Sequence, residues 1–172
     1  MKKWKQFAAF LLSCAVLVGL DQWTKALAVK HLMGQPPLVL IEGIFELTYL
    51  ENRGAAFGML QGRQTFFFLI AAVVVAAALF AVWRMPEEKK YFPLFLCAIG
   101  VVSGAVGNLI DRLLQGYVVD FFYFRLINFP VFNVADCYVT ISAAALILLF
   151  LFYYKDSDLE PFSLRQKKGD SF

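Results

Sequence analysis

The chain has 172 residues, of which 60% are hydrophobic and 17% are charged, with a net charge of +3 and a mean hydropathy of +0.66. Soluble domains contain about 45–50% apolar residues, so this composition excludes an ordinary water-soluble domain and indicates a membrane protein. Because a spanning helix takes about 20 residues, the length suits a single integral membrane domain over residues 1–172, without room for a second fold.

The first predicted helix covers about residues 6–29. A basic head precedes a 14-residue apolar run from Phe7 to Leu20. The same features suit a cleavable signal peptide, with Ala26-Leu27-Ala28 as the cleavage box. The charged segment Asp21–Lys25 directly before that box is unusual for a cleavage region, so we favour an uncleaved spanning helix.

A short β region follows the first helix. Gly34–Pro37 contains residues that end helices. The segment at about 38–58 is rich in β-branched and aromatic residues and partly alternates, as in Ile44–Leu50. This pattern predicts one or two strands on the membrane surface, and the glycines of Asn52–Gly58 suit a tight loop at their end.

Three later apolar segments predict helices over about 65–83, 92–114 and 132–154. The aromatic-rich stretch Phe121–Pro130 is typical of a membrane interface. The polar tail 155–172 is expected to be loosely ordered. The predicted fold class is therefore an all-α membrane protein with four transmembrane helices and a few surface strands.

Charge placement predicts the orientation of these helices. Ten of the 16 Lys and Arg residues lie in the head, in the short loop near residues 84–90 and in the tail. The positive-inside rule then puts both termini in the cytoplasm. Because the basic residues flank apolar segments, we expect no nucleic-acid partner. The polar residues at helix ends gather on the opposite, outer face, which favours a site at one interface over a channel through the membrane.

Asp120 and Asp136 are the leading candidates for catalysis. They lie at the two ends of the connection between the last two predicted helices, so a helical hairpin returns both carboxylates to one membrane face. Two close carboxylates share a proton and can act as base and acid on a water that attacks a peptide carbonyl. Simpler roles stay open, since Asp136 also completes a capping box with Asn133 and Asp120 can be a solvated loop acid.

Other polar residues near the same face have two interpretations. Asp21 and Lys25 are four positions apart, acid first, which favours a structural ion pair on a helix. Asn108 and Asp111 share a helix face, whereas Asp111 and its neighbour Arg112 point to different partners. For Asn108, Asp111 and Arg112, support of a site and simple charge compensation are both open.

Cysteine and histidine usage argues against disulfides and metals. Cys14, Cys97 and Cys137 lie far apart in hydrophobic segments, unlike a disulfide framework. His31 is the one histidine and is expected to lie at the interface. A zinc site needs several such ligands together, so we expect no metal and no cofactor.

The motifs around these residues resemble those of the lipoprotein signal peptidases, the signal peptidase II family. Five motifs appear in the family order along nearly the whole chain, namely Asp21-Gln22 with Lys25, Asn52–Phe57, Gly104–Arg112, Val119–Phe121 and Phe132–Asp136. Ser103 departs from the family pattern, which often has glycine there, but serine is also small. The order of the motifs on this hydropathy pattern makes the resemblance specific.

The resemblance implies an aspartic endopeptidase of the bacterial cytoplasmic (inner) membrane with Asp120 and Asp136 as its catalytic pair. The substrates implied are diacylglyceryl-modified prolipoproteins, cleaved just before the lipidated cysteine. Matching family positions imply five residues that support the site or bind substrate, namely Asn52, Gly54, Asn108, Arg112 and Asn133. Structural roles are expected for Asp21, Lys25 and Asp111. The family's small extracytoplasmic β-platform agrees with the strands predicted at 38–58. Membrane lipids are further partners, and we expect a monomer.

A non-enzymatic carrier or assembly scaffold is the competing hypothesis. It explains four helices with small-residue packing, but not why acids gather at one face while the inner halves of the helices stay apolar. An enzyme acting on a different lipid-linked substrate is a third possibility. Asp120→Asn separates the first two, because it leaves a scaffold working and abolishes an aspartic peptidase.

Overall fold

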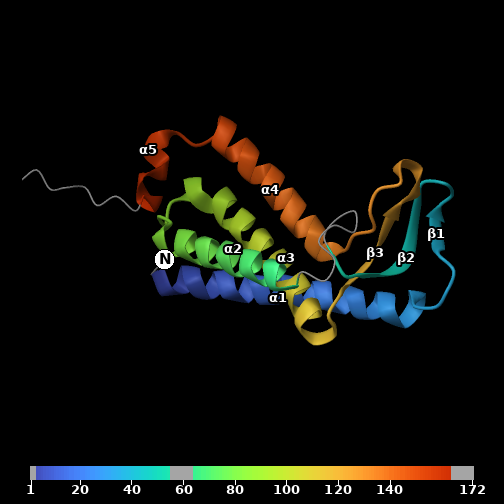
Figure 1. Ribbon diagram of the computed structural model, residues 1–172. Helices are drawn as coiled ribbons and strands as arrows, with labels where there is room; N and C mark the ends of the chain where they lie inside the picture. Colours follow the sequence, from blue (N-terminus) through green and yellow to red (C-terminus); the bar gives the residue numbers. More distant parts are fainter. Residues whose placement is uncertain (1–2, 55–63, 164–172) are drawn as a thin grey trace, which may run out of the picture.

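The computed structural model describes residues 3–54 and 64–163, which form a bundle of helices with a small sheet at one end (Figure 1). The main elements in chain order are α1 (Lys3–Leu32), β1 (Leu38–Ile41), β2 (Phe45–Asn52), α2 (Gln64–Arg84), α3 (Phe92–Gln115), β3 (Val118–Phe124) and α4 (Val134–Phe152). Short helical turns complete them, namely η2 (Lys89–Tyr91), η3 (Arg125–Ile127), α5 (Asp156–Leu159) and η4 (Glu160–Phe162). The chain enters α1 at the end of the bundle that lies away from the sheet.

Three helices within the described residues are long and apolar enough to cross a membrane, namely α1, Lys89–Gln115 and α4. The apolar stretch Phe68–Arg84 of α2 is shorter than these spans. Large apolar side chains point outward, as at Leu12, Val73 and Leu151. A mostly helical fold with helices able to cross a membrane is therefore confirmed, whereas four spans remain a prediction.

The helix bounds agree with the predicted segments to within a few residues. α1 extends past the predicted 6–29 at both ends and stops at Leu32, just before the Gly34–Pro37 breaker. α4 begins at Val134 because Asn133 caps it. The tail was expected to be loosely ordered, but up to residue 163 it forms α5 and η4. Tyr91 Oη donates to the Asp158 carbonyl at 2.9 Å and so anchors α5 to the bundle.

α3 is held closely against its neighbours because it presents glycines and small residues to them. A Cβ placed on Gly104 would collide with the carbonyl oxygen of Ala135 in α4. On another face, Ile99 and Val102 of α3 join Phe10 of α1 in a buried apolar cluster. α3 thus fixes α4 relative to α1, which positions the polar ends of all three helices.

The sheet is antiparallel in the order β1-β2-β3, and its third strand was not predicted. The predicted β region yields β1 and β2, while residues 55–58 lie outside the described residues. The aromatic stretch from Phe121 onward was expected to be an interfacial loop, yet its first part belongs to β3. The expectation failed because β3 is stabilised by pairing with β2, a distant segment that local patterns do not reveal.

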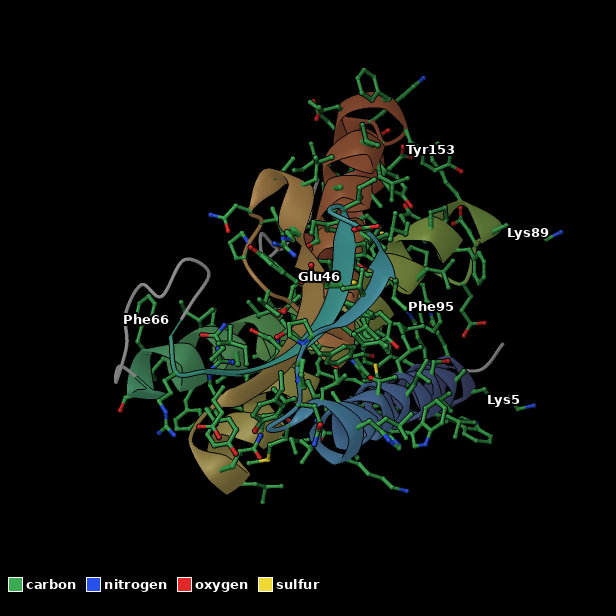
Figure 2. The ribbon with its side chains drawn as sticks, turned by 90° about the vertical axis from the view of Figure 1, so that its right-hand side faces the viewer. Lys5, Glu46, Phe66, Lys89, Phe95 and Tyr153 are labelled. Carbon is green, nitrogen blue, oxygen red and sulfur yellow. The ribbon has the colours of Figure 1, made fainter. Side chains whose placement is uncertain are left out.

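An ion pair between an exposed arginine and a buried glutamate, together with a β-bulge, shapes this sheet. Glu46 of β2, labelled in Figure 2, is 4% exposed, and Arg125 Nη1 donates to its carboxylate at 2.7 Å. The β2–β3 register shifts between Leu47, opposite Phe122, and Leu50, opposite Asp120. Bulges bend and twist a strand, and this one lies beside the acidic residue of β3.

Candidate active site

A cavity of about 560 Å³ lies where the sheet meets the polar ends of α3 and α4. Its lining residues come from β2, α3, β3, α4 and the segment before α4, and they are Asn52, Gly54, Asn108, Arg112, Val118, Asp120, Phe129–Phe132, Asp136, Cys137, Thr140 and Ile141. Carboxylates and amides thus share one space with an aromatic and aliphatic wall. Such a combination suits an extended, largely apolar ligand with one polar bond to be held.

Asp120 lies in β3 and is only 1% exposed, so the alternative role of a solvated loop acid does not hold. Its carboxylate accepts hydrogen bonds from Asn52 Nδ2 at 2.8 Å and from Asn133 Nδ2 at 2.6 Å. Burial, with the negative charge of Asp136 added, raises the pKa of Asp120 to about 7, although both amides oppose the rise. A carboxyl group with this pKa exchanges its proton near neutral pH.

Asp136 occupies the first turn of α4 and combines two roles. Its backbone N–H donates to Asn133 Oδ1 at 3.0 Å, and its Oδ2 accepts from the Asn133 N–H at 3.1 Å, which completes the predicted capping box. Its other oxygen accepts from Asn108 Nδ2 at 2.8 Å. Because Asp136 also lines the cavity, helix capping does not take it away from the site.

Two asparagine amides connect the acidic residues. Asn133 has no exposed surface, and its Nδ2 reaches Asp120 and also Asn108 Oδ1 at 3.1 Å. Asn108 in turn donates to Asp136. The chain of contacts therefore runs from one carboxylate to the other through side-chain amides, which orients both acids within the cavity.

A buried lysine lies behind these amides. Lys25 is 3% exposed, and its Nζ lies 2.9 Å from Asp21 Oδ2, 3.0 Å from Asp111 Oδ2 and 2.9 Å from Asn108 Oδ1. The predicted Asp21–Lys25 pair is present, but as part of a larger network between α1 and α3. Gln22 joins it by donating to Asp111 Oδ1 at 2.8 Å.

Arg112 links α3 to the end of β2. Its Nη2 donates to the Gly54 carbonyl at 3.2 Å, and the Gly54 N–H donates to Asn52 Oδ1 at 3.0 Å. Since the Asn52 oxygen is held by this backbone group, its Nδ2 faces Asp120. Arg112 and its neighbour Asp111 thus have different partners, as their positions on the helix predict.

The structure brings the sequence-predicted residues together around one cavity. The residues that line it are Asn52, Gly54, Asn108, Arg112, Asp120 and Asp136. Asn133 bridges the two acids, and the three residues expected to be structural form the buried network behind them. Across residues 3–54 and 64–163, no group of three or more His, Cys, Asp or Glu side chains is arranged to hold a metal ion.

Some cavity residues were not singled out from the sequence. Cys137, Thr140 and Ile141 line the cavity one, four and five positions after Asp136. Thr140 is four positions from Asp136 and shares its helix face, so its spacing is a signal that could have found it, and Cys137 and Ile141 are four positions apart from each other on a neighbouring face. Val118 was also missed, and finding it required the β2–β3 pairing.

The sequence matches a family model and many named relatives. The model for signal peptidase (SPase) II matches residues 13–152. A lipoprotein signal peptidase of Streptococcus thermophilus is 43% identical over 133 residues, which cover 77% of this chain and 86% of the relative. One of Caldanaerobacter subterraneus is 46% identical over 139 residues, covering 80% of this chain and 92% of the relative. One of Clostridioides difficile is 39% identical over 148 residues, covering 86% and 98%.

Solved structures of bacterial membrane enzymes share this fold. One, at 2.3 Å resolution, has a TM-score of 0.73 and 28% sequence identity and covers 94% of this chain and 95% of its own. Another, at 1.9 Å resolution, has a TM-score of 0.73 and 30% identity and covers 86% and 95%. Sequence and fold agree along most of both chains, and this chain belongs to the signal peptidase II family.

Proposed function

We propose that the chain is an aspartic endopeptidase that removes signal peptides from diacylglyceryl-modified prolipoproteins by cutting just before the lipidated cysteine. Membership of the signal peptidase II family supports a protease that processes prolipoproteins. One observation carries the aspartic chemistry: Asp120 and Asp136 line one cavity, and their interaction adds to the raised pKa of Asp120.

The two acids share a proton near neutral pH. Because like charges repel in a buried site, the pair loses its second proton only at a raised pH. The ionised carboxylate takes a proton from water, and the resulting hydroxide attacks the scissile carbonyl carbon. The protonated carboxyl donates a hydrogen bond to the carbonyl oxygen and then transfers its proton to the leaving amine as the C–N bond breaks, so the two carboxyls end with their protonation states exchanged.

The supporting residues hold this pair and the substrate. Asn52 and Asn133 donate to Asp120, while Asn108 donates to Asp136. Arg112 lies at the cavity wall, where its guanidinium N–H groups can bind substrate carbonyls, and the Gly54 carbonyl holds the guanidinium in place. Donors aimed at fixed positions lower the reorganisation needed when charge develops on the scissile carbonyl.

We propose that the cavity lies near the extracytoplasmic face of the bacterial cytoplasmic membrane. The chain then has four spans, with α2 as the second, and both termini are cytoplasmic, since Lys3, Arg84 and Lys155 lie at helix ends away from the cavity. The exposed apolar side chains of β1 suit a sheet resting against lipid, and they are Leu38, Val39, Leu40 and Ile41.

This placement matches the geometry of a lipidated substrate. The acyl chains stay in the bilayer and hold the scissile bond close to the interface, so enzyme and substrate meet almost in two dimensions. The aromatic segment Phe129–Phe132 lines the cavity and limits the access of water to the pair. One copy of the chain supplies all the residues named here, which supports a monomer as the working unit.

The test is cleavage of a purified diacylglyceryl-modified prolipoprotein in detergent, followed by gel shift. Wild type is compared with Asp120→Asn and Asp136→Asn, each checked for folding by thermal unfolding. We expect cleavage by wild type alone. Cleavage by all three removes the aspartic pair but keeps the peptidase, whereas a folded wild type that leaves the lipidated substrate intact favours a scaffold.

A further inference from the structure

Lys25 is a buried cation whose three N–H donors all have acceptors. The acceptors are Asp21, Asp111 and Asn108, each within 3.0 Å of Nζ. Burying an ion is costly even when it is paired, and a well-packed apolar residue often stabilises a fold as well or better. Stability alone therefore does not account for a lysine at this position.

The first partner of Lys25 reaches the backbone directly before one acid of the pair. Asp21 Oδ2 contacts the ammonium, and its Oδ1 accepts from the Ala135 N–H at 3.0 Å. Ala135 precedes Asp136 in the first turn of α4, where the backbone N–H has no partner within the helix. Lys25 thus fixes the carboxylate that holds the start of α4.

The second partner does the same for the other acid. Asp111 Oδ2 contacts the ammonium and also accepts from the Val119 N–H at 3.1 Å. Val119 precedes Asp120 in β3. The network therefore reaches a helix and a strand through matching contacts, one residue before each carboxylate.

The third partner sets the direction of an amide. An ammonium only donates, so the oxygen of Asn108 faces Lys25 at 2.9 Å, and its Nδ2 is left to donate to Asp136 at 2.8 Å. Asn133 Nδ2 donates to the same oxygen at 3.1 Å, so without the lysine the Asn108 amide keeps only one of the two donors that hold its oxygen away from the carboxylate.

Charge is a separate consequence of the same contacts. The acids that interact with Lys25 are Asp21 on α1, Asp111 on α3, Asp120 on β3 and Asp136 on α4. Other titratable groups face these acids, namely Arg112 on α3 and Cys137 and Tyr138 on α4. Acids outnumber bases in this set, and Lys25 lowers the pKa of Asp120 against the effect of burial.

We propose that Lys25 is a positioning residue that orients both acids of the pair and supplies the charge that keeps one of them ionised at neutral pH. The proposal rests on the proposed function and assigns Lys25 a role beyond holding α1 to α3. Lys25 does not line the cavity, so it acts through Asp21, Asp111 and Asn108 rather than by touching substrate.

The test compares the pH profiles of kcat and KM for wild type, Lys25→Met, Lys25→Arg and Asp111→Asn. Removing the positive charge in Lys25→Met raises the pKa of Asp120, so we expect the pH optimum to rise by about one pH unit and kcat at pH 7 to fall by about tenfold or more. KM should stay within about twofold. Asp111→Asn removes a negative charge and should move the optimum down, whereas Lys25→Arg keeps the optimum and lowers kcat.

Lys30→Met is the matched control, because Lys30 is an exposed lysine on the same helix. An unchanged optimum in both Lys25→Met and Asp111→Asn overturns the proposal, and if Lys25→Met does not fold, Asp111→Asn alone decides it. A plot of melting temperature against pH gives a readout independent of cleavage. In Lys25→Met the fall in melting temperature should occur at a higher pH than in wild type. Failure of the proposed function gives a different result from failure of the Lys25 proposal. If the proposed function fails, wild type leaves the substrate intact or Asp120→Asn still cleaves it.

Discussion

Asn133 and Asp120 are joined by a hydrogen bond of 2.6 Å that runs from a helix cap to a strand. The same Asn133 side chain accepts from the backbone of Asp136 and so begins α4. One residue therefore serves both the stability of a helix and the orientation of an acid on a neighbouring strand. A substitution that keeps the side-chain oxygen but removes the amide nitrogen tests the two roles separately.

We predict that Asn133→Ser keeps the cap and loses the site, whereas Asn133→Ala loses both. Both variants lose the buried hydrogen bonds of the Asn133 amide nitrogen, but serine retains a capping oxygen, so alanine should be less stable than serine by about 1 kcal/mol. Loss of the donor to Asp120 should lower kcat by about ten- to a hundredfold in both variants. Chemical unfolding and cleavage kinetics measure the two effects, and a fully active serine variant contradicts the assignment.

A second prediction concerns stability against pH. The carboxyl of Asp120 has a pKa of about 7 in the fold against an ordinary value of 3.8, so the folded state holds a proton that the unfolded chain has lost between these values. The contribution of Asp120 to the stability of the fold is therefore fully present below about pH 4 and is lost as pH rises through about 7. The difference corresponds to at most about 4 kcal/mol.

Thermal unfolding in detergent from pH 5 to pH 9 checks this sign. We expect the wild-type melting temperature to fall across the range and the fall to be much smaller in Asp120→Asn. The asparagine variant supplies its own reference at pH 5, so a general loss of stability does not affect the comparison. Equal slopes in the two proteins would show that Asp120 is not the titrating group.

A third prediction tests the close contact of α3 with α4. In Gly104→Ala the new methyl group collides with the backbone carbonyl oxygen of Ala135, so the helices must separate. We expect a loss of about 1–3 kcal/mol of stability, together with reduced cleavage because Asp136 moves with α4. Gly19→Ala is the control, since nothing lies within 4 Å of its added Cβ. A neutral Gly104→Ala would contradict the packing described here.

A fourth prediction uses the cysteine that lines the cavity. Cys137 is half-buried at the cavity wall, whereas Cys14 and Cys97 are buried in the helix bundle. A small methanethiosulfonate reagent should therefore inactivate the wild type, and lipidated substrate should slow the loss. Cys137→Ser should retain cleavage and resist the reagent. Equal inactivation of this variant would assign the effect to another thiol.

The helices were predictable because their signal is local. A long apolar run needs no partner elsewhere in the chain to be identified, and the Asn133–Asp136 capping box marked the start of α4. The catalytic candidates were found because their motifs repeat a family pattern in order. The position of Asp120 on a strand was missed, since β3 depends on pairing with β2, and Leu50 opposite Asp120 is 70 residues earlier.

The sequence predicted only part of the buried network around Lys25. The four-residue spacing of Asp21 and Lys25 predicted their contact, but not the links from Lys25 to Asp111 and Asn108 on another helix. Those links depend on how α1 lies against α3, which apolar periodicity does not specify. The sequence therefore predicts the members of the site more readily than the contacts that hold them.

The hydrogen bond from Ala135 to Asp21 joins residues 114 positions apart, so the first helix made is needed to complete the last. On the proposed function, a nascent chain has no hydrolytic centre until α4 has packed beside α1. Proteolytic activity then begins only once insertion is finished, and a partly translocated chain is harmless to its neighbours. The same dependence suits a split enzyme, in which two separately expressed fragments regain cleavage only when they associate in the membrane.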